Sequence, residues 1–365
     1  MHRIPDIPTR TERAIDLLRT LIATPSFSRE EDQTAAILEH FLQADGIEVF
    51  REKNNVWARA AVWRPERPVL LLNSHHDTVK PVKEWTRDPF DPAIEQGRLY
   101  GLGSNDAGAS LVSLITAFLH LQSDPELPVN LVFAASAEEE ISGTNGIAAA
   151  LPVLGPIDFA IVGEPTRMQM AIAEKGLLII DAEAKGKAGH AAREEGINAI
   201  YKAMDAIQVI RGLKPERVSP MLGSVKITVT QIEAGYQHNV VPDSCRMVMD
   251  VRTNELYQNE EMFQWLQERL EGPELKARSF RLNSSRIPVE HPLVQSGLAL
   301  GLSTYGSPTL SDQSLMSFPS LKIGCGDSAR SHTANEYIEL SEIREGIVTY
   351  IQLISGIIPA KSEMP

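Results

Sequence analysis

The stretch Leu70-Leu71-Leu72-Asn73-Ser74-His75-His76-Asp77-Thr78-Val79 combines an apolar run with a His-x-Asp pair. A short apolar run of this kind is typical of a buried strand. Because side chains two positions apart lie on the same face of a strand, His75 and Asp77 are expected to point in the same direction at its end. A carboxylate beside an imidazole commonly fixes the tautomer of a metal-binding histidine. The stretch therefore predicts a buried strand that delivers a histidine and an orienting acid to a site.

Further acidic residues and one more histidine follow apolar segments or lie in polar turns downstream. They are Asp106, the run Glu138-Glu139-Glu140, Glu164 and His332. Taken singly, each is equally well explained as part of a turn, a loop or a solvated face. Together they form an ordered set, and two histidines with several carboxylates suit a pair of cations such as zinc, cobalt or manganese.

Asp106 lies in the glycine-rich segment Gly101-Leu102-Gly103-Ser104-Asn105-Asp106-Ala107-Gly108, which precedes a predicted helix. A dinucleotide-binding loop would have glycine at the position of Asp106, and an anion there would repel a phosphate. A carboxylate in a turn that allows close approach suits a bridging metal ligand better.

The run Glu138-Glu139-Glu140 follows a predicted buried strand. A run of charges usually forms a solvated face. Adjacent carboxylates repel one another, however, so one of them is expected to bind a cation or to hold a proton. That is the pairing needed for a metal ligand beside a general base.

Length and composition limit the protein class. The chain has 365 residues, which is too long for one compact core, so we expect two domains. Its net charge of −13 argues against nucleic-acid binding through non-specific electrostatics. It has two cysteines and no CxxC pair, which predicts a reducing compartment and no thiolate metal site. Met1–Asp6 has no secretion-signal pattern and no apolar run is long enough to span a bilayer, so we expect a cytoplasmic protein without a membrane partner.

Hydrophobic periodicity predicts that helices and strands alternate in the first half of the chain. A first helix ends near Ile22, and a second is expected from Ser28 to Gly46, with Ser28 and Glu31 forming a capping box. The other expected elements are strands at 56–62, 69–74, 129–135 and 159–163 and a helix at 108–121. This alternation predicts an α/β sheet with helices on both faces and a site at the strand ends.

The pattern changes near Gly176. Strands are expected at 177–185, 224–233, 245–251 and 277–282, with helices at 196–211 and 260–270. The order β-α-β-β-α-β matches the ferredoxin-like split motif. After Pro288 the chain returns to a helix at 291–302, a strand at 321–324 and a last helix at 341–354. We therefore predict a catalytic domain formed by 1–175 and 288–365, with an inserted domain at 176–287.

The motifs together resemble the M20 family of co-catalytic metallopeptidases and deacylases, over about Glu12 to Ile354. They are Ser74–Val79, Tyr100–Gly103 with Asp106, the glutamate run, Gly163–Thr166, Gly189–Ala192, and His332 with Asn335-Glu336. The resemblance implies a zinc-peptidase-like catalytic domain with a mixed sheet. It also implies that the ferredoxin-like α+β insert is a lid and dimerisation domain, so that the protein is a homodimer.

The resemblance also implies individual roles. His75 and Glu164 complete one metal site, and Glu140 and His332 complete the other. Asp106 is the ligand that bridges the two ions. Asp77 orients His75, and Glu139 is the general base. Glu138 takes the place of the aspartate that is usual in the family. A shift by one residue, with Glu138 as base and Glu139 as ligand, stays open. Cys325 stands where many relatives have proline, and we assign it no chemistry.

In the lid, the resemblance implies that His190 donates a hydrogen bond to the oxyanion of the reaction, often across a dimer. Asn239 and Arg252 match positions where relatives contact the substrate carboxylate. Residue type alone would make His190 a surface histidine, and Arg252 equally suits a pairing with a structural acid.

The expected activity is metal-dependent hydrolysis of the amide bond of a small N-acyl amino acid, with two divalent ions, zinc or cobalt. The whole chain looks nearest the acetylornithine deacetylase group. This implies N-acetylornithine, N-acetylcitrulline or the succinyl equivalents as substrates, in arginine biosynthesis. The alternatives are a succinyl-diaminopimelate desuccinylase, an M20 dipeptidase or aminoacylase, and, more remotely, a metal-free binding relative that has lost catalysis.

Overall fold

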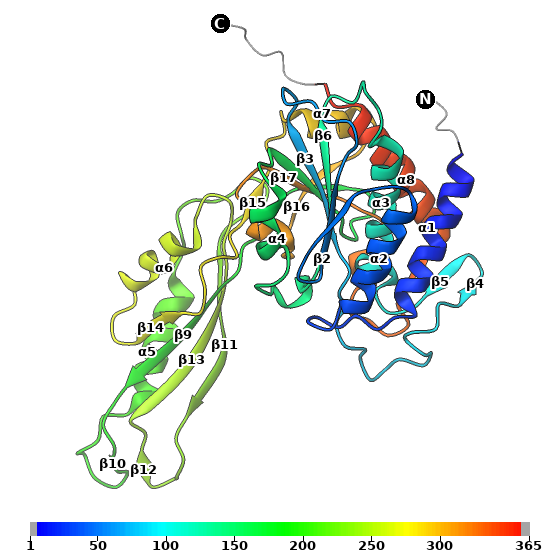
Figure 1. Ribbon diagram of the computed structural model, residues 1–365. Helices are drawn as coiled ribbons and strands as arrows, with labels where there is room; N and C mark the ends of the chain where they lie inside the picture. The colour runs from blue at the N-terminus through cyan, green and yellow to red at the C-terminus, as the bar shows by residue number, and fades with distance from the viewer. Residues whose placement is uncertain (1–5, 359–365) are drawn as a thin grey trace, which may run out of the picture. The chain divides into compact units, whose positions relative to one another are not determined.

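The computed structural model describes residues 6–358 and divides the chain into two compact units (Figure 1). The first unit consists of Met1–Ile172, Ile287–Tyr305 and Ser311–Pro365, and the second of Ala173–Arg286 and Gly306–Leu310. The sequence does not predict that Gly306–Leu310 belongs to the second unit. The secretion-signal expectation rests on residues 1–6, of which 1–5 lie outside the described residues. Within residues 6–358, no helix combines the length and apolar character needed to cross a membrane.

The first unit alternates helices and strands, as the periodicity predicts. Its helices are α1 (Ile7–Ile22), α2 (Asp32–Ala44), α3 (Ala109–Leu121), α4 (Ile147–Leu154), α7 (Pro292–Ala299) and α8 (Leu340–Ser355). The strands of its large sheet are β1 (Val49–Glu52), β2 (Asn55–Arg59), β3 (Val69–His75), β6 (Asn130–Ser136), β7 (Phe159–Val162), β8 (Met170–Glu174) and β17 (Ser320–Lys322). Their spatial order is β1-β2-β6-β3-β7-β17-β8. A small sheet joins β4 (Ile94–Glu95), β5 (Arg98–Tyr100) and β18 (Tyr337–Glu339).

The large sheet is mixed, as expected. Strand β3 pairs in parallel with both β6 and β7, β17 continues the parallel part, and β2 runs antiparallel to β6. At its far side β8 also pairs with β15 (Ser285–Arg286) and β16 (Thr304–Ser307). Because β3, β6 and β7 are parallel neighbours, their carboxyl ends lie at one edge of the sheet, where open α/β sheets place their sites.

Strand β3 is buried along its whole length because helices cover both faces of the sheet (Figure 1). Leu70 and Leu72 belong to the core that contains residues of α1, α2, α3 and α8. Leu71 lies in a smaller core with residues of α4. A continuous apolar run is the pattern expected of such a doubly covered strand, and it explains why Leu70–Leu72 carries no polar residue.

The second unit has the predicted β-α-β-β-α-β order. It contains β9 (Leu178–Lys185), α5 (Ala199–Gly212), β11 (Lys226–Ala234), β13 (Ser244–Arg252), α6 (Asn259–Gln267) and β14 (Glu274–Ala277). The sheet order β11-β13-β9-β14 is that of the ferredoxin-like motif, and alternate residues of β9 are buried against α5 and α6. A separate ribbon pairs β10 (Gly189–His190) with β12 (Val240–Val241).

Two local predictions are wrong. Helix α2 begins at Asp32 and has no capping box, because the Ser28 hydroxyl donates to Oδ2 of Asp77 over 2.7 Å and Glu31 accepts from the Arg29 amide over 2.6 Å. The last strand of the β-α-β-β-α-β motif is β14 at 274–277 rather than at 277–282. It is a half-exposed edge strand, so its hydrophobic pattern is weak.

Candidate metal centre

The candidate site lies at the shared carboxyl edge of β3, β6 and β7. His75 is the last residue of β3 and is buried. Glu139 and Glu140 lie in the turn Glu139–Ile141 that follows β6, and Glu164 follows β7. Nε2 of His75 lies 3.8 Å from Oε1 of Glu164 and 4.0 Å from Oε2 of Glu139. The parallel pairing therefore brings together residues that are up to 89 positions apart in the sequence.

Asp106 lies between the two histidines. Its Oδ1 is 3.3 Å from Nε2 of His75, and its Oδ2 is 3.6 Å from Nε2 of His332. Nε2 of His332 also donates to Oε2 of Glu140 over 2.9 Å. One carboxylate thus faces one histidine with each oxygen, which is the arrangement needed for a ligand shared by two ions.

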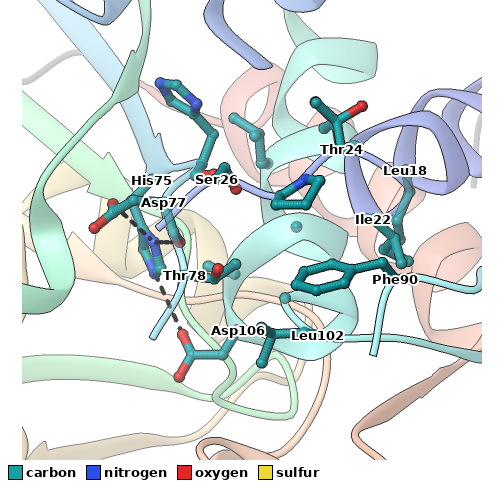
Figure 2. Close-up of a pocket in the computed structure, with 17 residues that line it drawn as sticks. Leu18, Ile22, Thr24, Ser26, His75, Asp77, Thr78, Phe90, Leu102 and Asp106 are labelled. Carbon is teal, nitrogen blue, oxygen red and sulfur yellow. Dashed lines mark hydrogen bonds and ion pairs between the residues drawn. The ribbon is translucent and has the colours of Figure 1, made fainter. Parts of the chain in front are cut away.

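Asp77 holds the glutamate turn as well as the histidine. Its Oδ1 accepts from the Glu139 amide over 3.0 Å, and its Oδ2 accepts from the Glu140 amide over 3.2 Å. Nδ1 of His75 lies 2.9 Å from the backbone oxygen of Asp77 and 3.5 Å from Oδ1 (Figure 2). The backbone carbonyl is therefore the nearer partner of the imidazole, and it fixes Nε2 as the nitrogen that faces the cluster.

Glu138 has different partners from the two glutamates that follow it. Its Oε1 accepts from Nδ2 of Asn145 over 2.9 Å and its Oε2 from the Asn145 amide over 3.2 Å. Its own amide donates to Glu31 over 3.2 Å. Both Glu138 oxygens are thus occupied by Asn145, which favours Glu139 as base and Glu140 as ligand over the assignment shifted by one residue.

Crowded acids at the site have altered proton affinities. Burial, reinforced by the charge of Glu164, raises the pKa of Glu139 well above its usual range. Burial also raises the pKa of Glu164 to about 8. The hydrogen bond to Glu140 raises the pKa of His332 to about 9. Such a cluster is held together either by protons or by cations, because its carboxylates cannot all carry uncompensated charge at this depth.

The donor set fits divalent cations. Two groups of ligand atoms each lie within 4.8 Å of one another, His75 with Asp106 and Glu140, and His75 with Glu139 and Glu164. Imidazole nitrogen and carboxylate oxygen without thiolate suit zinc and manganese, and a borderline cation such as cobalt. The two groups share His75, whereas Asp106 belongs only to the first and His332 to neither. The side chains present are therefore able to hold divalent ions, and Asp106 faces both His75 and His332.

A pocket adjoins one side of the cluster (Figure 2). His75, Asp77 and Asp106 contribute its polar wall, and the opposite wall is apolar, with Ile22 and Phe90 among its residues. His75 is 1% accessible, so water screens the interactions of its imidazole with the carboxylate partners only weakly.

Three predicted residues lie in the second unit. His190 and Asn239 are exposed and lie on the ribbon of β10 and β12, where the Ala191 amide donates to the Asn239 backbone oxygen over 2.9 Å. Arg252, at the end of β13, forms a fork with Asp250, with bonds of 2.8 and 3.0 Å. The structure thus places His190 and Asn239 together, and it gives Arg252 the acidic partner that the sequence allows.

Sequence reasoning missed Asp312. This buried carboxylate accepts from Nδ2 of Asn73 over 2.8 Å and from Oγ of Ser136 over 2.6 Å. Burial raises the pKa of Asp312 to about 6. The available indication was the presence of polar Asn73 and Ser136 in strands that are otherwise apolar, because a buried polar side chain needs a partner.

Comparison with known proteins is consistent with this geometry. A profile of the peptidase family M20/M25/M40 matches residues 71–356. The chain is 28% identical over 273 residues to a succinyl-diaminopimelate desuccinylase of Caulobacter sp. (strain K31), covering 70% of this chain and 69% of that protein.

Solved structures share the fold. The aminopeptidase PepT of Bacillus cereus superimposes with a TM-score of 0.78 at 19% identity, covering 95% of this chain and 98% of that one. A Bacillus subtilis protein described as a dinuclear metal-binding peptidase of the M20 family gives a TM-score of 0.74 at 18% identity, covering 96% and 98%.

Proposed function

Since the chain belongs to the peptidase family M20/M25/M40, we propose that it is a metal-dependent hydrolase that cleaves the amide bond of a small N-acyl amino acid. The observation that carries this proposal is the position of Asp106, with one oxygen toward His75 and the other toward His332. Glu139 lies beside this pair, 4.0 Å from His75. This arrangement supports the proposal of a shared ligand beside a base, which suits metal-assisted amide hydrolysis.

We propose that two divalent ions occupy the site, zinc first and cobalt as the alternative. His75 and Glu164 would hold one ion, Glu140 and His332 the other, and Asp106 both. When bound, such a pair polarises a carbonyl and makes water more acidic. Binding would also compensate the charge of the acids whose pKa values burial raises.

Glu139 is the proposed general base. Burial raises the pKa of its carboxyl group, which favours a group that can hold a proton taken from the attacking water. Its backbone is held by Asp77, so its carboxylate stays beside the cluster. The same carboxyl group would then return the proton to the leaving amine. His190 is the proposed donor to the oxyanion, which forms on the carbonyl oxygen when water attacks the carbonyl carbon.

The first proposed substrates are N-acetylornithine and N-acetylcitrulline, or their succinyl equivalents, in arginine biosynthesis in the cytoplasm. Asn239 and Arg252 are the proposed contacts to the substrate carboxylate. For Arg252 this contact would use the guanidinium donors that the fork to Asp250, made through Nε and Nη2, leaves free. The second candidate is desuccinylation of N-succinyl-diaminopimelate, which the similarity to the Caulobacter desuccinylase favours. An M20 dipeptidase or aminoacylase activity is the remaining alternative.

We also propose a homodimer formed through the second unit. Strand β11 is an edge strand of its sheet, and α5 exposes Tyr201 and Met204, which are 66% and 51% accessible. An open edge and exposed apolar side chains on a neighbouring helix are features of a pairing surface. Light scattering after size exclusion tests this proposal, with the charged variant Met204→Glu expected to shift the mass toward one chain.

A substrate panel tests the proposed function. The enzyme, reconstituted with Zn²⁺ or Co²⁺, is assayed with acetyl- and succinyl-ornithine, -citrulline and -diaminopimelate and with a set of dipeptides, before and after chelation. We expect one acyl amino acid to show the highest kcat/KM, with loss of turnover in chelator and recovery on adding metal. The Glu139→Gln protein serves as the control for contaminating hydrolases. Activity that persists in the metal-free protein would contradict the proposal.

A further inference from the structure

Glu336 is a buried acid without an assigned role in the proposed reaction. It lies four residues after His332 and is 2% accessible. Its carboxylate accepts three backbone hydrogen bonds from the turn that carries Asp106. The amides of Asn105 and Asp106 donate to Oε1 over 2.8 and 2.9 Å, and the Gly103 amide donates to Oε2 over 3.1 Å.

The small sheet explains how Glu336 reaches this turn. Strands β5 and β18 are antiparallel, with Tyr100 opposite Tyr337. Tyr100 directly precedes the turn and Tyr337 directly follows Glu336, so this pairing places Glu336 opposite Gly101. The Gly101 amide accordingly donates to the backbone oxygen of Glu336 over 3.0 Å. Backbone pairing and the carboxylate thus anchor the same turn.

The turn has a conformation that needs such support. Gly103 has a φ of +76°, and a Cβ at this position would come within 2.6 Å of Cγ2 of Thr78. Its backbone is therefore held in a left-handed conformation, close to the residues that follow β3. Without the carboxylate, three amides of this turn would lose their acceptor, and the backbone of Asp106 would lose its nearest anchor.

Glu336 does not have the position of a ligand. Each of its carboxylate oxygens accepts from at least one amide of the turn that contains Asp106. Because those amides use its oxygens, the carboxylate acts on the turn and not on an ion. The segment from His332 to Glu336 therefore contains one expected ligand, His332, and contacts the turn that carries another, Asp106.

We propose that Glu336 is a positioning residue that sets the place of Asp106, and thereby the ability of the site to hold two ions through one shared carboxylate. This inference rests on the two-ion site of the proposed function. Partners that hold metal ligands in place typically change metal affinity or activity by about 10- to 100-fold when they are removed. We expect a loss of that size mainly in the affinity for the ion to whose binding Asp106 contributes most.

The test compares Glu336→Ala and Glu336→Gln with the wild type. Ions per chain are counted by elemental analysis, Mn²⁺ affinities are measured by calorimetry, and EPR of the Mn²⁺-loaded proteins separates coupled pairs from isolated ions. For Glu336→Ala we expect the weaker ion to lose at least about tenfold in affinity, with the coupled spectrum replaced by that of isolated ions. Gln keeps one acceptor oxygen but turns an NH₂ group toward an amide, so we expect a smaller loss in the same direction.

Asn130→Ala is the matched control. Asn130 is also 2% accessible and also forms three hydrogen bonds to backbone, with Arg64 and Arg67, but it lies at the opposite end of β6 from the site. The Asn130→Ala protein should be less stable than the wild type but should still bind the coupled ion pair. Should both Glu336 variants bind two coupled ions within twofold of the wild-type affinities, the role of Glu336 is refuted. A wild-type protein that binds no ion pair would instead refute the proposed function.

Discussion

The backbone amide of Glu139 donates to Oδ1 of Asp77 over 3.0 Å. Asp77 follows β3 and Glu139 follows β6, so this bond ties the ends of two neighbouring parallel strands at the site. The carboxylate that sequence pattern links to His75 therefore also determines where the proposed base lies. Perturbing Asp77 should consequently affect both metal binding and proton transfer.

The first prediction concerns the base. Glu139→Gln should lower kcat by at least about 100-fold and leave two ions bound, because the amide keeps the shape but cannot accept a proton. Glu138→Gln should keep most of the activity, because Glu138 bonds to Asn145 and not to the cluster. Steady-state kinetics with elemental analysis checks both variants. The opposite pattern, with metal loss in Glu139→Gln and loss of turnover in Glu138→Gln, would establish the shifted assignment.

The second prediction concerns Asp77. Asp77→Asn should weaken metal binding by about 10- to 100-fold and lower kcat. In one orientation its NH₂ group would face the Glu139 amide, and in the other it would face both the Ser28 hydroxyl and the Glu140 amide. Calorimetric titration of the chelated protein with Zn²⁺ measures the first effect. Ser28→Ala removes only one of the three donors and should show a much smaller change. Equal losses in the two variants would mean that the backbone contacts of Asp77 contribute little.

The third prediction separates the two ions. His332→Ala should retain one ion and lose the other, because His332 contacts Glu140 and Asp106 but has no described contact with Glu164. His75→Ala should instead lose the ion assigned to His75 and Glu164, whose side chains lie 3.8 Å apart. Elemental analysis after dialysis against dilute Zn²⁺ gives the stoichiometry. Two ions retained by His332→Ala would exclude it as a ligand.

The fourth prediction concerns His190. His190→Ala should lower kcat with little change in metal affinity, because it removes an exposed donor and no ligand. If this histidine acts on the partner's site, mixing His190→Ala chains with Glu139→Gln chains restores part of the activity, since some mixed dimers contain one intact site. Activity is compared with each variant alone in verified mixed dimers. An absence of complementation would restrict His190 to its own chain or to no catalytic role.

The fifth prediction uses Asp312, whose pKa burial raises from 3.8 to about 6. Between these values the folded protein binds more protons than the unfolded chain, so this group stabilises the fold most at low pH and the contribution is lost as pH rises through about 6. Relative to Asp312→Asn, the wild type should lose up to about 3 kcal/mol of unfolding free energy between about pH 4 and about pH 7.

Urea unfolding of the two proteins in chelator measures this difference. The asparagine keeps an oxygen that can accept from Asn73 and Ser136, so the variant is expected to fold. Asp124→Asn removes an exposed charge in the same unit and serves as the control. Parallel pH profiles for wild type and Asp312→Asn would show that the carboxyl does not titrate in this range.

The sequence predicts the strands whose patterns are strong. The apolar run before His75, the helix after the glycine-rich turn and the β-α-β-β-α-β order all appear in the structure. Four of the candidate ligands could be found for the same reason, since His75, Glu140 and Glu164 come at or after the ends of buried strands and Asp106 lies in a glycine-rich turn. What local pattern cannot specify is which strands pair, and so it could not place Asp77 on the amides of Glu139 and Glu140.

Short elements and long-range partners escape sequence reasoning. Strands β5 and β18 have three residues each, too few for any periodicity, although their pairing places Glu336 on the turn of Asp106. Asp312 contacts Asn73, 239 positions earlier, and nothing near either residue indicates the other. The Ser28–Glu31 pattern was misleading because the Ser28 hydroxyl bonds to a residue distant in sequence, Asp77, and not to the start of the helix as the capping-box pattern predicts.

The segment Gly306–Leu310, which contains the end of β16 and the loop after it, belongs to the second unit although it is distant in sequence from Ala173–Arg286. The chain therefore enters or leaves this unit at four points. Ser307 accepts from the Lys175 amide over 3.1 Å, and a Cβ on Gly306 would lie 2.3 Å from the backbone oxygen of Met221. If residues 173–286 alone were removed, Gly306–Leu310 would lose the residues against which it packs. Exchange of this unit between relatives, by recombination or by design, therefore requires that both segments be transferred together.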